Sequence, residues 1–342
     1  MSRAERNAWI AGVVGLAGAL IGWMLAPRAF AFAWLAALIA WIGWPLGSMA
    51  LLLVHALTGG RWGEAVRPAL TGGVLSLPLL LPALVPMLLS LPALYPWLHA
   101  DLAAHLGNRF YLNAPFFAGR GIVYLVAWFG LAGLMLRALR RGFPLGRLAP
   151  AGLIVLALTV TFASMDTTLS LDPEFNSSIF GMLAAASGGL LALAVAVLFT
   201  AADRHTTDDL GKLLLGIVVL WAYLDFMQIL IVWESDLPTE AAWYIRRSSG
   251  VWAYVAALIA VLHFALPFAL LLSPRLRRTR GGIGAVAALL IAAEILRAWW
   301  LVLPAVPRGI GLIDLAAMLA FGGTGMALAL RLAPAPLAVR HG

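Results

Sequence analysis

Cysteine is absent from the 342 residues of this chain. The chain can therefore form no disulfide, no thiolate-ligated zinc site and no iron–sulfur cluster of its own. Charge is also scarce, at 11% of the residues, and no polar stretch is long enough to form a separate soluble domain. The sequence thus predicts a single integral membrane domain over residues 1–342.

Apolar residues make up 63% of the chain. A helix that crosses the hydrocarbon core of a bilayer needs about 20 mainly apolar residues. The apolar runs are unbroken, whereas the strands of a membrane β-barrel alternate apolar and polar residues. The sequence therefore predicts an all-α polytopic membrane protein with about ten transmembrane helices. The expected spans are 8–26, 30–57, 69–94, 114–138, 148–165, 179–200, 212–233, 250–273, 283–303 and 310–332.

Lysine and arginine gather on one side of this predicted membrane domain. Sixteen of the 23 lie at the two termini or in the loops after the second, fourth, sixth and eighth spans, and five lie in the other loops. Because cytoplasmic loops carry the excess of basic residues, both termini are expected on the cytoplasmic side. Topology thus accounts for the net charge of +8 without a nucleic-acid partner.

The third span holds four prolines, at positions 78, 82, 86 and 92. Each proline removes a backbone donor and can kink the helix. We therefore expect this span to be irregular, with its free backbone groups bonded inside the helix bundle.

Two connections on the less basic side are acidic. The first, MDTTLSLDPEFNSS, carries Asp166 and Asp172, and the second is WESDLPTEAAWYIRR. A charged loop is most often a solvated face. The alternative is a docking surface or the outer end of a proton path, in which Asp166 and Asp172 would be the exit.

Ionisable side chains at bilayer depth are costly and mark a pathway or a pair. Three consecutive spans carry one each: Asp225 in the seventh, His263 in the eighth and Glu294 in the ninth. Gln228 follows Asp225 at i+3, on nearly the same helix face. Since burial can tune carboxylates and histidine toward neutral pKa values, these groups are candidates for a proton relay.

Structural explanations compete with the relay. Glu294 and Arg297 have the i, i+3 spacing of an ion pair within one helix. Asp225 can equally be satisfied by Tyr223, Gln228 or a neighbouring helix. A third possibility is a quinone pocket lined by Trp221, Tyr223 and Asp225, although aromatic residues in a helix bundle more often serve packing.

The chain is not expected to hold haem or a catalytic metal by itself. Bis-histidine ligation of haem needs two imidazoles at matching depth on facing helices, and only His263 is central in a span. The HExxH, GxSxG and phosphate-loop motifs are also missing from the sequence.

Two segments resemble a known family of membrane subunits. The first is DDLGKLLLGIVVLWAYLDFMQILIVWESDLPTEAAWYIRR, with its DLGKL opening, its WAY triplet and Gln228. The second is SSIFGMLAAASGGLLALA, at residues 177–194. Both resemble the NrfD and polysulfide-reductase-type membrane subunits, and within them the ActF-type subunit of alternative complex III, the quinone-binding subunit 2 of quinol:cytochrome c oxidoreductase.

The resemblance implies a subunit of a respiratory quinol:electron-acceptor oxidoreductase in the bacterial inner membrane, rather than an enzyme that acts alone. It implies two four-helix bundles with flanking helices, and an electron-transport or proton-translocation role. Quinone is a possible ligand, whereas haem and iron–sulfur clusters are expected in partner subunits, among them a multihaem cytochrome. The alternatives are a self-standing proton-coupled transporter and a structural membrane anchor.

Overall fold

The computed structural model describes residues 1–99, 101 and 106–333. Within that part of the chain, ten helices are long and apolar enough to cross a membrane, which confirms the predicted all-α polytopic fold. They are α1 (Arg3–Leu25), α2 (Pro27–Thr58), α3 (Arg61–Leu75) with α4 (Leu80–Leu89), α7 (Ala114–Arg140), α8 (Ala149–Thr167), α9 (Phe180–Phe199), α10 (Arg204–Ser235), α12 (Val251–Ile259) with α13 (Leu266–Leu272), α15 (Arg280–Val302) and α16 (Leu312–Leu332).

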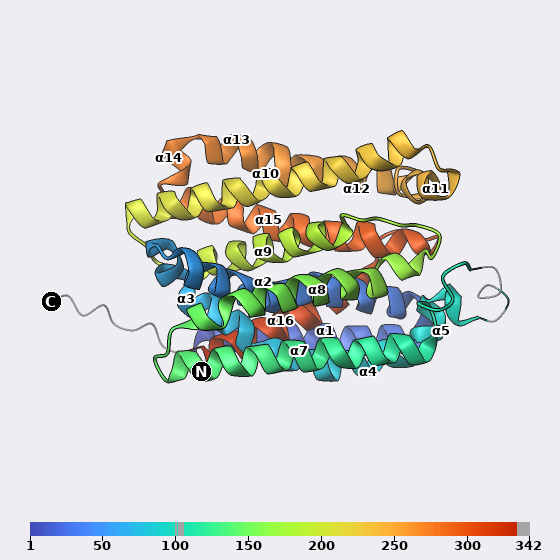
Figure 1. Cartoon of the computed structure of the whole chain (residues 1–342), viewed down its shortest axis with the longest axis horizontal. Helices are drawn as coiled ribbons and strands as arrows, with labels where there is room; N and C mark the ends of the chain where they lie inside the picture. The colour runs from blue at the N-terminus through green and yellow to red at the C-terminus, as the bar shows by residue number, and fades with distance from the viewer. Residues whose placement is uncertain (100, 102–105, 334–342) are drawn as a thin grey trace.

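The helices run side by side along the long axis of the molecule (Figure 1). The start of α1, the α2–α3 connection and the short helix α14 (Pro274–Arg277) lie at one end, on the left of the view, which we name the basic end. The short helices α5 (Leu91–Leu94) and α11 (Pro238–Arg247) lie at the other, which we name the acidic end. Residues 334–342, predicted to lie at the basic end, are outside the described residues.

Contacts between helices divide the molecule into two groups. Helices α9, α10, α13 and α15 contact one another in a closed ring, which we name the second bundle. In the first bundle α2 contacts α3, α4 and α8, and α8 contacts α7. Helix α2 joins the two groups through α9 and α15, while α16 packs on α2 and α3 and is in turn covered by α1.

The third span is broken, as its prolines predict. Helix α3 ends at Leu75, and a 3₁₀ turn, η1 (Leu77–Leu79), separates it from α4. At the break, the buried Ser76 donates to the carbonyl of Gly73 from both its hydroxyl, at 2.7 Å, and its backbone N–H, at 3.1 Å.

The eighth span departs from the unbroken helix that was expected. Between α12 and α13, residues Ala260–Ala265 form a π-helix, η5, with His263 in it. Such insertions are uncommon and occur often at functional sites. The π-helix therefore marks His263 as a candidate functional residue.

Close packing of small residues holds α1 against α16. A Cβ atom at Gly15 would lie 2.7 Å from the carbonyl oxygen of Ala316 and from the carbonyl carbon of Leu319, both backbone atoms. Because backbone cannot yield as a side chain can, Gly15→Ala should destabilise the protein by about 1–3 kcal/mol. Thermal unfolding in detergent measures this, with Gly130→Ala as the control because a Cβ there meets nothing within 4 Å. Equal stability of the two variants would contradict the packing argument.

Candidate functional site

The second bundle buries a hydrogen-bonded pair of His263 and Glu294. Nε2 of His263 lies 2.9 Å from Oε1 of Glu294, and the two side chains are 0% and 8% exposed. Residue spacing places His263 about 18 Å, and Glu294 about 12 Å, from the acidic ends of their helices. Nδ1 of His263 is buried without a hydrogen-bond partner in the described part of the chain. The imidazole therefore has one anchored nitrogen and one nitrogen available for proton exchange.

Trp221 fixes the histidine ring from the facing helix. Its ring centroid lies 3.7 Å from that of His263, and its Nε1 donates to Oγ of Ser187 on α9 at 3.0 Å. The indole therefore orients the imidazole of His263.

Arg297 also belongs to this cluster, but it does not form the ion pair with Glu294 that the i, i+3 spacing predicts. In place of the predicted pair with Arg297, Glu294 pairs with His263, because the facing helix brings the imidazole within hydrogen-bond distance. The Arg297 guanidinium, 6% exposed, lies 5.6 Å from the centre of the Trp221 ring. Among the residues that the structure describes, it makes no hydrogen bond and no ion pair.

Asp225 faces the same cluster from α10. It lies within electrostatic range of Arg297, His263 and Glu294. Its carboxylate makes no hydrogen bond or ion pair with any described residue, and the residue is partly exposed. Neither Tyr223 nor Gln228 satisfies it, so the structural explanation of Asp225 finds no partner in the described part of the chain.

A large apolar cavity adjoins this cluster. It has a volume of about 680 Å³, lies mainly within the first bundle, and reaches Ser187, Glu294 and Arg297 of the second. Leu88 of α4 and Ile122 of α7 line it and are 55% and 62% exposed on the apolar surface. The cavity therefore opens between α4 and α7, on the side of the molecule that faces lipid.

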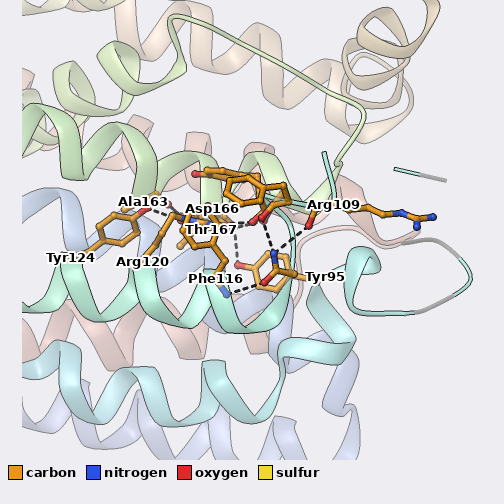
Figure 2. Close-up of polar contacts among 12 residues, drawn as sticks. Tyr95, Arg109, Phe116, Arg120, Tyr124, Ala163, Asp166 and Thr167 are labelled. Atoms are coloured by element: carbon orange, nitrogen blue, oxygen red, sulfur yellow. Dashed lines mark hydrogen bonds and ion pairs between the residues drawn. The ribbon is translucent and has the colours of Figure 1, made fainter. Parts of the chain in front are cut away.

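Asp166 lines the cavity and is the centre of a cluster of polar side chains (Figure 2). Nε and Nη2 of Arg120 donate to the two oxygens of Asp166, each at 2.8 Å, and the Tyr124 hydroxyl donates to Oδ2 at 2.7 Å. Figure 2 shows these side chains converging on Asp166 from α7. Asp166 and Tyr124 line the cavity as well.

The surroundings of Arg120 add to this arrangement. Its Nη1 donates to the carbonyl of Tyr111 at 2.9 Å, and its guanidinium lies 3.7 Å from the centre of the Tyr111 ring. Burial, together with the negative charge of Asp166, raises the pKa of Tyr111 to about 12. The Tyr111 hydroxyl is therefore neutral at physiological pH, and Arg120 is the positive group that balances Asp166.

The expected place of Asp166 in a solvated acidic loop needs correction. Asp166 lies within α8 and is 2% exposed, because the buried Arg120 of α7 requires a counter-ion. Asp172 does lie beyond the helix, and it pairs with Arg246 at 2.9 Å. Asp166 thus belongs to the cavity, while Asp172 belongs to the surface.

The structure does not assemble the expected quinone pocket on α10. Trp221 is 3% exposed and faces the interior, whereas Tyr223 is 57% exposed on the opposite side of the helix. Sequence reasoning also missed Arg120 and Tyr124, and it missed the cavity. An arginine inside an apolar span was the signal that could have prompted a search for a buried carboxylate.

No cluster of three or more His, Cys, Asp or Glu side chains that could hold a metal ion is present in residues 1–99, 101 and 106–333. No known family model matches the chain, and no curated protein matches it. The chemistry of this site therefore follows from its geometry.

Proposed function

We propose that this multi-pass membrane protein is the quinol-interacting subunit of a respiratory quinol:acceptor oxidoreductase, and that its second bundle handles the protons. One observation carries the proposal. An apolar cavity that opens toward lipid has in its wall Glu294 and Arg297, which belong to a buried cluster of ionisable groups. A ligand that is both lipid-soluble and able to release protons fits that combination.

The dimensions and lining of the cavity suit a quinol. Its volume of about 680 Å³ lies in the usual range for sites that bind one small molecule. An isoprenoid tail would leave between Leu88 and Ile122. The hydroxyl groups of the quinol ring can bind at two polar parts of the cavity wall. One is formed by Tyr124 and Asp166, the other by Glu294 and Arg297.

The protons and electrons of the reaction have separate destinations. Oxidation of a quinol to a quinone releases two electrons and two protons. The electrons pass to a haem or iron–sulfur centre, which we place in partner subunits because this chain has no cysteine. The protons pass to the cluster, where Glu294 and His263 receive them first and Asp225 next.

The resemblance of residues 177–194 and 208–247 to NrfD-type and ActF-type subunits supports this assignment. With it we infer an inner-membrane location in a bacterium, with the basic end in the cytoplasm, as the positive-inside rule predicts. Multihaem cytochrome and iron–sulfur subunits are the partners that the proposal requires.

A substitution that fills the cavity tests quinol binding. Gly121 of α7 lines the cavity, and a Cβ atom there meets nothing within 4 Å, so Gly121→Leu adds bulk at the cavity wall without a clash at Cβ. We expect the affinity for a quinol analogue to fall about tenfold or more, which corresponds to a loss of about 1.4 kcal/mol. Isothermal titration of the detergent-purified complex measures it.

Gly133→Leu is the matched control, since Gly133 lies on the same helix, outside the cavity, and also has open space around its Cβ position. Equal binding by both variants would place the quinol elsewhere.

A further inference from the structure

A second pocket, of about 360 Å³, lies at the acidic end of the second bundle. The connection between α8 and α9 and the last turns of α10 form its wall. In contrast to the first cavity, this wall is rich in polar side chains: Asn108, Ser170, Asn176, Ser177, Gln228 and Glu240. Polar groups around a space of this size are suited to hold water.

Gln228 forms the floor of this pocket and is held there by two hydrogen bonds. Its Oε1 accepts from the Ser177 hydroxyl at 2.8 Å, and its Nε2 donates to the Tyr244 hydroxyl at 3.1 Å. The side chain is 3% exposed. Asp225 lies one helical turn deeper, on nearly the same face of α10, so Gln228 separates that carboxylate from the pocket.

Tyr244 interacts with both Gln228 and Asp225. Burial raises the pKa of Tyr244, the hydrogen bond from Gln228 opposes this, and the negative charge of Asp225 adds to it. The phenol therefore stays protonated at physiological pH, and its hydroxyl can accept one hydrogen bond while it donates another. Its hydroxyl and that of Ser177, which lines the pocket, bond to the same Gln228 side chain.

The opposite direction, from the cluster toward the basic end, is apolar and tightly packed. The residues there are buried to 2% exposure or less on three helices of the bundle: Leu210, Leu214, Val218, Leu271, Val286 and Leu290. Neither hydroxyl nor carboxyl groups interrupt this set, so it offers a proton no carrier.

Beyond that layer, ion pairs close the basic end. Asp208 of α10 accepts from Nε of Arg277 at 2.7 Å and pairs with Lys212 at 2.9 Å and Arg278 at 3.3 Å. The pair with Arg277 joins α10 to α14. The second bundle is therefore closed on its basic side and polar on its acidic side.

We propose that the pocket above Gln228 is the water-filled outlet through which Asp225 exchanges protons with the aqueous phase at the acidic end. Gln228 is the positioning residue, because it holds the Ser177 and Tyr244 hydroxyls where water can bridge them to Asp225. In each transfer the carboxyl group of Asp225 gives its proton to pocket water and becomes a carboxylate. Glu240 at the pocket wall is the next acceptor. The proposal rests on the proton role of the cluster in the proposed function, whereas access of water to Asp225 does not require quinol.

Thiol labelling tests the outlet directly, because the natural chain has no cysteine. Gln228→Cys, Ser177→Cys and Asp225→Cys are each prepared in the intact complex in oriented vesicles. A membrane-impermeant, cationic methanethiosulfonate reagent is then added to one side, and the mass of this chain is measured. We expect all three cysteines to react from the acidic-end side, and Asp225→Cys to be at least about tenfold slower from the basic-end side.

Two controls on the same helix give the background. Phe226 is 58% exposed toward lipid and Leu214 lies in the buried apolar layer, so neither Phe226→Cys nor Leu214→Cys should react. Labelling of Asp225→Cys from the basic-end side alone would overturn the outlet. Failure of both Ser177→Cys and Gln228→Cys to react would also overturn the outlet, provided that these variants unfold at the same temperature as the natural protein.

A second measurement asks whether the pocket carries protons. Gln228→Leu should slow proton release on the acidic-end side about tenfold or more, because the hydroxyl chain loses the group that orders it. The affinity for a quinol analogue should stay unchanged, whereas a general structural defect would lower it. Unchanged proton release in Gln228→Leu would contradict the outlet, even if the protein binds the quinol analogue. Labelling from the acidic-end side without any binding of the quinol analogue would support the outlet and contradict the proposed function.

Discussion

Replacement of Glu294 by glutamine should lower the rate of quinol oxidation by the purified complex about 100-fold or more, the usual effect of losing a positioned acid–base group. The glutamine side chain retains the shape of glutamate and can still accept a hydrogen bond from Nε2 of His263. It can neither hold an exchangeable carboxyl proton nor carry a negative charge. We therefore expect assembly to be normal and the chemical step to be slow.

The pH profile separates a proton role from a structural one. In the natural protein the rate should depend on the protonation of the His263–Glu294 pair, and one limb of the profile should disappear in Glu294→Gln. Glu64→Gln serves as control, because Glu64 lies in the first turn of α3, at the basic end. A rate and profile like those of the natural protein would remove Glu294 from the proton path.

Asp166→Leu should destabilise the protein by about 3–5 kcal/mol, since it leaves the Arg120 guanidinium buried without a counter-ion. The side chains of Arg120 and Asp166 are 10% and 3% exposed, so water cannot replace the lost carboxylate. The double variant Arg120→Leu with Asp166→Leu should recover most of the loss, because it removes both charges. Unfolding in detergent, followed by tryptophan fluorescence, measures these differences.

The surface pair of Asp172 and Arg246 provides the comparison. These side chains are 17% and 46% exposed, and Asp172→Asn should cost less than about 1 kcal/mol. If Asp166→Leu is no more destabilising than Asp172→Asn, the Asp166 cluster does not hold α7 and α8 together.

The spans could be predicted because length and hydropathy decide membrane insertion almost alone. The break after Ser76 was also predictable, since proline acts on its own helix. The π-helix at Ala260–Ala265 was not, because its apolar residues have no pattern that differs from a regular helix. Its residues contact α10 and α15, and the sequence of the span does not reveal these neighbours.

The candidate site, like the fold, could be predicted from the sequence only in part. Asp225, His263 and Glu294 stand out as charges in apolar spans, and the structure places them in one cluster. Their pairing could not be predicted: the partner of Glu294 comes from a facing helix 31 residues away, in preference to Arg297 on the same helix. Asp166 looked like part of an acidic loop, because its partner Arg120 lies 46 residues earlier. The cavity arises only when the helices pack.

Purification of the tagged chain from its native membrane in mild detergent, with mass spectrometry and an absorption spectrum, tests the central claim most directly. We expect haem-containing and iron–sulfur subunits to accompany it, and added quinol to reduce their haem. Blocking the cavity with Gly121→Leu should weaken that reduction while the subunits still co-purify. A lone, colourless protein would contradict the account and would favour a proton-coupled transporter built on the same cluster.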